Sequence, residues 1–128
     1  MDIKWKELYD LARKTTNPKD ISDTISVGSV GAAVLSKSGN IFTGICIDTS
    51  SSLGMCAERN AISTMFSNGE YEIDRICSVY FDGTIMPPCG ACREFMMQTG
   101  INAKNIEVLV GEDKVMLLGD LLPEYSNC

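Results

Sequence analysis

The chain has 128 residues, of which 45% are hydrophobic and 22% are charged. This length and composition suffice for one domain with a buried core and exclude an intrinsically disordered protein. Seventeen acidic and eleven basic residues give a net charge of −6, which argues against a DNA or RNA partner because phosphates require a basic surface. The sequence contains no histidine, so imidazole is excluded as a metal ligand, nucleophile or base.

The N-terminal segment shows no targeting signal. Residues 1–7 are rich in charge and lack the apolar core of a signal peptide. No run of about 18 apolar residues is present that could form a transmembrane helix. Six cysteines in a chain without signs of secretion are more often metal ligands or catalytic groups than disulfides. We therefore expect a cytoplasmic protein that binds neither a membrane nor a nucleic acid.

The first elements in chain order are a helix and a hairpin. Residues 2–15 predict an amphipathic helix whose apolar side chains recur at helical spacing, namely Trp5, Leu8, Tyr9 and Ala12. The Asn17-Pro18 pair ends this helix, because the residue before a proline disfavours helical backbone. Residues 30–36 and 41–47 predict two strands, joined by a Gly-Asn turn that tolerates positive φ.

The second half of the sequence alternates helices and strands. Helices are predicted at 55–67 and 89–98, and the second of these follows a Pro-Pro pair. The remaining elements are strands at 73–82, 106–110 and 115–118 and a short turn of helix at 120–123. A hairpin followed by two strand–helix units predicts one α/β domain over residues 1–128, with a mixed sheet between layers of helices.

Two cysteines at the start of a predicted helix form a C-x-x-C motif, Cys89-Gly90-Ala91-Cys92. Both thiols lie on one face of the helix, and the positive end of the helix favours their ionised form. The motif alone leaves three interpretations open: a pair of zinc ligands, a thioredoxin-like redox pair, or two cysteines of the core.

A third cysteine, Cys56, also opens a predicted helix and favours the zinc interpretation. Three thiolates from two helix N-termini can hold tetrahedral zinc and leave the fourth position to water. Glu58 can reach that water without binding the metal, as metal-activated hydrolysis requires. Arg59 can donate to the sulfurs and offset their excess negative charge, although an exposed helix charge is the alternative.

Together these motifs resemble the cytidine deaminase family, in its small zinc-dependent type with three cysteines. The zinc-deaminase signature places H-x-E before P-C-x-x-C, and cysteine is an accepted substitute for the histidine. Blasticidin S deaminase is related to the same pattern. The resemblance runs from about residue 30 to 123 and rests on Val30-Gly31-Ala32-Ala33, the Gly39-to-Gly44 hairpin, Cys56-Ala57-Glu58-Arg59, Pro88 to Arg93 and Leu121-Leu122-Pro123.

The resemblance implies a fold, a reaction and an assembly. The family fold is a three-layer α/β/α sandwich with a mixed five-stranded sheet. The implied reaction is hydrolytic deamination of a free cytosine nucleoside, of the cytidine or deoxycytidine to uridine type, in pyrimidine salvage. The implied assembly is a homotetramer, or alternatively a homodimer, whose subunits share active sites.

The resemblance also assigns roles to individual residues. A zinc-bound hydroxide acts as the nucleophile, and Glu58 shuttles its proton to the ring nitrogen and the leaving amine. The backbone N–H of Ala57 holds the ring carbonyl, and the carbonyl of Pro87 lies near the departing amino group. Arg59 donates to the sulfurs. The implied Zn²⁺ ligands are Cys56, Cys89 and Cys92.

The substrate-facing residues depart from the family pattern. Where cytidine deaminases usually grip the ribose with Asn-x-Glu, this chain has Cys46-Ile47-Asp48. Asp48 can still accept from a hydroxyl, but a thiol is a weak partner, and the loss could cost about 1–3 kcal/mol. The family often has an aromatic residue at the position of Gly28. A second family aromatic, after the Leu-Leu-Pro sequence, lies one residue away from the position of Tyr125. We therefore keep a modified or bulkier cytosine nucleoside, such as blasticidin S, as the alternative substrate, in a pocket widened by Gly28, Cys46 and the Ser50-Ser51-Ser52 loop.

The other cysteines allow further interpretations. Cys46 is either a small buried residue or a fourth zinc ligand that closes a structural site. Cys77 is predicted to be part of the core, and Cys128 is expected to be disordered.

Two more remote functions remain open. One is a thiol–disulfide oxidoreductase that uses Cys89 and Cys92. The other is a deaminase-fold protein that binds nucleosides without catalysis, although retention of Glu58 argues against it.

Overall fold

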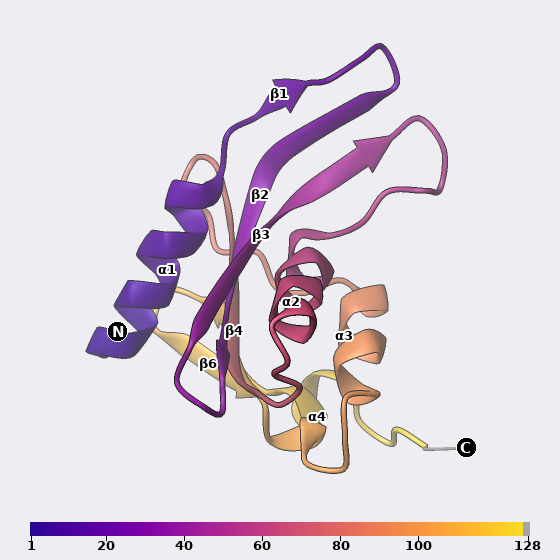
Figure 1. The fold of residues 1–128 in the computed structure, drawn as a ribbon. Helices are drawn as coiled ribbons and strands as arrows, with labels where there is room; N and C mark the ends of the chain where they lie inside the picture. Colours follow the sequence, from indigo (N-terminus) through magenta and orange to yellow (C-terminus); the bar gives the residue numbers. More distant parts are fainter. Residues whose placement is uncertain (127–128) are drawn as a thin grey trace.

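One mixed sheet with helices on both faces forms the fold of the computed structural model, which describes residues 1–126 (Figure 1). Helix α1 (Ile3–Thr15) covers one face, whereas α2 (Ala57–Ser67) and α3 (Gly90–Met97) lie on the other (Figure 1). The predicted three-layer α/β/α sandwich is confirmed. Among the described residues, no helix combines the length and hydrophobicity that a membrane crossing requires.

Within residues 1–126 the sheet has six strands, one more than the five predicted. Its central strand β2 pairs antiparallel with β1, β3 and β4, while β5 pairs parallel with β4 and antiparallel with β6. The additional strand β1 consists of two exposed residues, so it has no apolar alternation that could predict it. The six strands are β1 (Lys19–Asp20), β2 (Ile25–Ser36), β3 (Ile41–Thr49), β4 (Ile73–Tyr80), β5 (Glu107–Gly111) and β6 (Lys114–Leu117).

Alternate residues of β2 enter two different cores, because successive side chains of a strand point to opposite faces. Ala32 and Val34 belong to the core cluster that contains the buried face of α2. Ala33 and Leu35 belong to the cluster on the α1 side. The second half of this strand is therefore buried on both faces, between the two helical layers.

The N-terminal helix forms as predicted. The Asp2 carboxylate caps it by accepting from the Trp5 N–H at 2.8 Å. Trp5, Leu8 and Ala12 are buried against the sheet, while Tyr9 is partly buried and packs beside them. The hydroxyl of Tyr9 donates to the carbonyl of Gly83 at 2.7 Å and ties the helix to the loop after β4.

Strand β2 begins at Ile25, five residues earlier than the predicted start at 30. Its register with β3 breaks between Val27 and Gly31, where Gly28 adopts a φ of +82°. A Cβ at Gly28 would collide with the carbonyl oxygen of Asn17, whose N–H donates to the Gly28 carbonyl at 2.9 Å. The structure thus assigns Gly28 a backbone role, and it does not support the expectation that this glycine widens the substrate pocket.

The C-terminal part of the described chain completes the α2 side of the sheet. The predicted strand 115–118 is confirmed as β6, which pairs with β5. The predicted final turn of helix lies two residues earlier, as α4 (Leu118–Leu121), directly after β6. A 3₁₀ turn at Ala103–Asn105 precedes β5. The expectation for Cys128 lies outside the described residues.

Candidate active site

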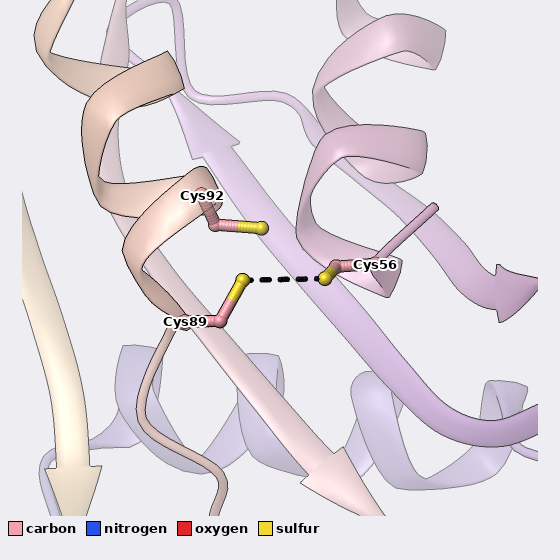
Figure 2. A group of neighbouring side chains, drawn as sticks. All are labelled: Cys56, Cys89 and Cys92. Carbon is pink, nitrogen blue, oxygen red and sulfur yellow. Dashed lines mark hydrogen bonds between the residues drawn. The ribbon is translucent and has the colours of Figure 1, made fainter. Parts of the chain in front are cut away.

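Three cysteine side chains meet where the N-termini of α2 and α3 approach each other (Figure 2). Cys56 is the N-cap of α2, Cys89 is the N-cap of α3, and Cys92 lies in the first turn of α3. The Sγ atoms of Cys56 and Cys89 are 3.4 Å apart, and all three Sγ atoms lie within 4.8 Å of one another. The three cysteines predicted as ligands are thus brought together.

Neither N-cap cysteine caps its own helix. An N-cap side chain usually accepts from a backbone N–H of the first turn. Cys56 and Cys89 make no such hydrogen bond, and both thiols point toward the shared cluster instead (Figure 2). Two helix ends with their positive dipoles therefore face a group of potential thiolates.

Close packing of α2 on β3 positions Cys56. A Cβ at Gly44 would collide with the backbone N–H of Ala61, so the helix can approach this strand only over a glycine. The Asn60 side chain donates to the Ile45 carbonyl at 2.6 Å. Just before the helix, Met55 and Ile47 exchange two backbone hydrogen bonds of 2.8 and 2.9 Å.

Arg93 fixes the segment that carries Cys89. Its Nε donates to the Pro88 carbonyl at 2.8 Å, and its Nη1 donates to the Leu121 carbonyl at 3.1 Å. The arginine of the P-C-x-x-C-R sequence therefore connects the start of α3 with α4. These contacts position the segment that carries Cys89 and leave its sulfur free of them.

The donor set fits a zinc ion. Tetrahedral zinc with Zn–S bonds of about 2.3 Å needs sulfurs about 3.8 Å apart, and the 3.4 Å between Cys56 and Cys89, with all three sulfurs within 4.8 Å of one another, is compatible with that spacing. Thiolates are soft ligands that favour zinc over magnesium or calcium. In the described part of the chain, Cys46 stands apart from this cluster, which argues against its role as a fourth ligand.

The surroundings affect the three thiols differently. Burial raises the pKa of Cys56 and of Cys92 above the ordinary thiol value. Burial also opposes ionisation of Cys89, but the nearby backbone N–H groups of the first α3 turn and the neighbouring thiols favour its thiolate and together lower the pKa of Cys89. Arg59 Nη2 donates to Cys56 Sγ at 3.7 Å, as predicted, and this contact raises the pKa of Arg59.

Glu58 lies beside the cluster, in the first turn of α2, with only 6% of its surface exposed. Its Oε2 accepts from the Ser78 hydroxyl at 3.2 Å. Burial raises the pKa of the Glu58 carboxyl, while its own N–H, the Ser78 hydroxyl and the Arg59 charge lower it less strongly. The result is a carboxyl that holds its proton at higher pH than an exposed glutamate.

A cavity of about 440 Å³ opens above the cluster. Its walls come from β2, β3, β4, the loop before α2, the first turn of α2 and the segment before α3. Cys92 lies below it and is fully buried. All the other residues predicted for the site line this cavity, namely Cys46, Asp48, Cys56, Ala57, Glu58, Arg59, Pro87 and Cys89.

Cys46 lines the cavity and contacts three polar groups of neighbouring residues. Its Sγ accepts from the Val30 N–H and lies beside the Ser29 hydroxyl, both at 3.3 Å. Its thiol also lies 3.6 Å from an oxygen of the exposed Asp48 carboxylate. Cys46 is thus a buried residue whose hydrogen bonds are already made within the chain. Cys77 is in the core beside α1, as predicted.

Two residues of the site were absent from the predicted set. Ser29 lines the cavity and lies within the irregular β2–β3 register between Val27 and Gly31. Ser78 is a buried polar residue in an otherwise apolar strand segment, Ile76 to Val79. That isolated hydroxyl was the available sequence signal, because a polar group in a buried strand needs a specific partner.

Comparison with known proteins places the chain in a family. Residues 5–108 match the sequence model of the cytidine and deoxycytidylate deaminase zinc-binding region. A cytidine deaminase from Halalkalibacterium halodurans is 34% identical over 100 residues, covering 73% of this chain and 74% of that protein. A blasticidin-S deaminase from Bacillus cereus is 36% identical over 76 residues, covering 52% and 54% of the two chains.

The fold agrees with these sequences. The crystal structure of cytidine deaminase from Mycobacterium tuberculosis superposes with a TM-score of 0.82 at 26% identity, covering 99% of this chain and all of the other. The chain therefore belongs to the cytidine and deoxycytidylate deaminase family. It is an enzyme of the hydrolytic aminohydrolase class.

Proposed function

We propose that this protein removes the exocyclic amino group from a free cytosine nucleoside by zinc-dependent hydrolysis, with cytidine or deoxycytidine as substrate. The observation that carries the proposal is the position of Glu58, a buried carboxyl that lines the same cavity as the cysteine cluster. A metal site and an adjacent proton-transfer group are what hydrolysis of an aromatic amine requires. The relatives named as cytidine deaminases support the same substrate class.

In this proposal Cys56, Cys89 and Cys92 hold a Zn²⁺ ion. Zinc with three protein ligands polarises a water molecule and thereby supplies a nucleophile at neutral pH. The Arg59 guanidinium, which donates to Cys56 Sγ, and the two helix N-termini reduce the negative charge that three thiolates would place on the metal.

Glu58 moves the protons of the reaction. Its carboxylate takes one proton from the attacking water and gives it to the ring nitrogen of the cytosine. The water oxygen adds to the ring carbon that bears the amino group, and the bond from that carbon to nitrogen then breaks. Glu58 delivers the second proton to the departing amine, so that one water is consumed and one ammonia is released. Burial raises the pKa of Glu58, which suits a group that must both accept and donate.

Backbone groups at the cavity orient the base. Ala57 follows the N-cap of α2, so its N–H has no partner within the helix and can donate to the ring carbonyl. The carbonyl of Pro87 is proposed to receive the departing amino group. Asp48 is proposed to accept from a sugar hydroxyl, with Cys46 beside it in the position of the usual asparagine.

A second candidate is deamination of a modified or bulkier cytosine nucleoside, such as blasticidin S. The observation that favours it is the sugar-side wall, where the small Cys46 replaces asparagine and is engaged by Ser29 and Val30. The relative named blasticidin-S deaminase supports this candidate over about half of its length.

We further propose a single cytoplasmic domain that assembles as a homotetramer or homodimer with shared active sites. Exposed apolar side chains at and near the cavity mouth support an assembly, since Leu53 is 82% and Phe81 47% exposed.

The test is ammonia release by the zinc-loaded protein from cytidine, deoxycytidine, free cytosine and blasticidin S. Metal-free protein and the Glu58→Gln variant serve as blanks. We expect both nucleosides to be turned over and free cytosine to react far more slowly. Turnover of blasticidin S alone would establish the second candidate instead. No ammonia from any compound, with zinc bound, would refute both.

A further inference from the structure

Ser78 is the buried residue of the site that the proposed function does not use. It lies in β4, with 2% of its surface exposed. Its neighbours Cys77 and Val79 point to the α1 side of the sheet and belong to the apolar core there. Ser78 therefore points to the opposite face, toward α2 and the cavity, whose wall it helps to form.

The Ser78 hydroxyl connects two parts of the site that come from different elements. Its Oγ lies 3.2 Å from Glu58 Oε2 on α2 and 2.7 Å from the carbonyl oxygen of Met86. The Met86 N–H in turn donates to the Ser78 carbonyl at 2.9 Å. The hydroxyl has one proton, so it donates either to the Met86 carbonyl or to the Glu58 carboxylate, and it can donate to Met86 while it accepts from a protonated Glu58 carboxyl. Ser78 thus contacts Met86 through its backbone and its side chain, and the Glu58 carboxyl through the same hydroxyl.

Met86 directly precedes Pro87, whose carbonyl we propose to face the leaving amine. The hydroxyl of Ser78 therefore sets the distance between the proton-transfer group and the segment that receives the product nitrogen. A hydroxyl suits this position because it can donate to a carboxylate or accept from a protonated carboxyl. Apolar residues of the same size could fill the space, but they could not direct the carboxyl.

We propose that Ser78 is a positioning residue that orients the Glu58 carboxyl for proton transfer and aligns it with the Met86–Pro87 segment. This inference rests on the proposed role of Glu58. Ser78 acts through Glu58 and Met86, because its hydroxyl contacts the carboxyl of the first and the carbonyl of the second. Its loss should therefore affect the chemical step more than substrate binding.

The experiment compares zinc-loaded wild type with Ser78→Ala and Ser78→Cys in steady-state deamination. We expect Ser78→Ala to lower kcat by roughly 10- to 100-fold, the effect of one hydrogen bond to a charged group, with KM changed less than about threefold. Ser78→Cys nearly keeps the volume but offers only a weak donor, so it should be similarly impaired. Zinc content should equal that of wild type in both variants.

Ser36→Ala is the matched control. Ser36 is also 2% exposed and also donates to a glutamate, Glu70, but it pairs with the opposite end of β4. It should lose comparable stability and keep the wild-type kcat. If Ser78→Cys retains wild-type kcat, or if Ser36→Ala loses as much kcat as Ser78→Ala, the role of Ser78 is only structural and the inference is overturned.

Crystal structures of zinc-loaded wild type and Ser78→Ala separate this inference from the proposed reaction. We expect the Glu58 carboxyl to be displaced or split between conformers in the variant. If wild type deaminates none of the compounds, the proposed function fails, while the position of Glu58 in the two structures still decides the inference. An unchanged Glu58 carboxyl would refute it.

Discussion

The sulfur atoms of Cys56 and Cys89 lie 3.4 Å apart, although 33 positions separate the two residues in the chain. Each cysteine is the N-cap of a different helix, and neither uses its thiol to cap that helix. The contact therefore joins two helix N-termini through groups that remain free to bind a metal (Figure 2). Buried beside this contact, Glu58 completes the set of groups required for hydrolysis.

Replacement of Glu58 by glutamine tests the proton shuttle. The amide keeps the shape of the side chain and can still pair with the Ser78 hydroxyl, but it cannot carry a proton between substrate atoms. We expect kcat to fall by roughly 10²- to 10⁴-fold. Zinc content, measured by atomic absorption, should remain that of wild type. A loss of less than about tenfold with the metal retained would contradict the role of Glu58.

In the metal-free protein, the thiols should differ in their reactivity toward an alkylating reagent. In the metal-free protein, Cys89 is exposed and its pKa lies below the ordinary thiol value, so its reactive thiolate forms at lower pH. Cys77 is buried, and burial raises its pKa to about 12. Iodoacetamide labelling followed by mass spectrometry, from pH 6 to 9, should modify Cys89 well before Cys77.

Zinc provides the control for this labelling. Added before the reagent, it should protect Cys89 and leave the slow modification of Cys77 unchanged. Labelling of Cys89 that is equally fast with and without zinc would argue against this cysteine as a ligand.

Substitution of Asp48 by alanine tests the sugar contact. Loss of one hydrogen bond to the substrate should raise KM for cytidine by roughly 3- to 10-fold and leave kcat within about twofold. Asp10→Ala is the control, because Asp10 is also an exposed aspartate but lies on α1, on the other face of the sheet. An unchanged KM would show that Asp48 makes no contact with the sugar.

Substitution of Gly28 by alanine tests the backbone role of this glycine. Alanine would have to adopt a φ of +82° and would collide with the Asn17 carbonyl. Gly39→Ala is the matched control, since Gly39 has a φ of +93° but no atom near the added Cβ. Both variants incur backbone strain of about 1–2 kcal/mol, and the collision should cost Gly28→Ala about 1–3 kcal/mol more.

Urea unfolding of the two glycine variants measures this difference. Equal free energies of unfolding would show that the approach of Asn17 imposes no constraint at Gly28. The expectation of a pocket widened by this glycine would then be open again.

Most elements of the fold could be predicted from local pattern. The helix at 2–15, the hairpin at 30–47 and the strand–helix alternation after it depend on apolar periodicity and on turn residues, which are local properties. Strand β1 and the first five residues of β2 could not be predicted. They are exposed or interrupted by Gly28, and only pairing with distant strands makes them part of the sheet.

The chemical groups of the site could also be predicted from the sequence, without its geometry. The C-A-E-R and P-C-G-A-C sequences specify thiols and a carboxylate at the starts of helices, because residue type and helix position are properties of the chain itself. The meeting of Cys56 with Cys89 and Cys92 depends on two helices packing side by side on one face of the sheet. No local pattern could predict that distance.

The sequence by itself therefore determined which groups are available and which secondary structure holds them. The tertiary structure decided which groups act on one another. It directed Ser78 to the Glu58 carboxyl and surrounded the Cys46 thiol with Ser29 and Val30. It also gave Gly28 a backbone role against Asn17. The physical reason is that these contacts depend on strand register and close packing between distant segments, which only the folded chain brings into range.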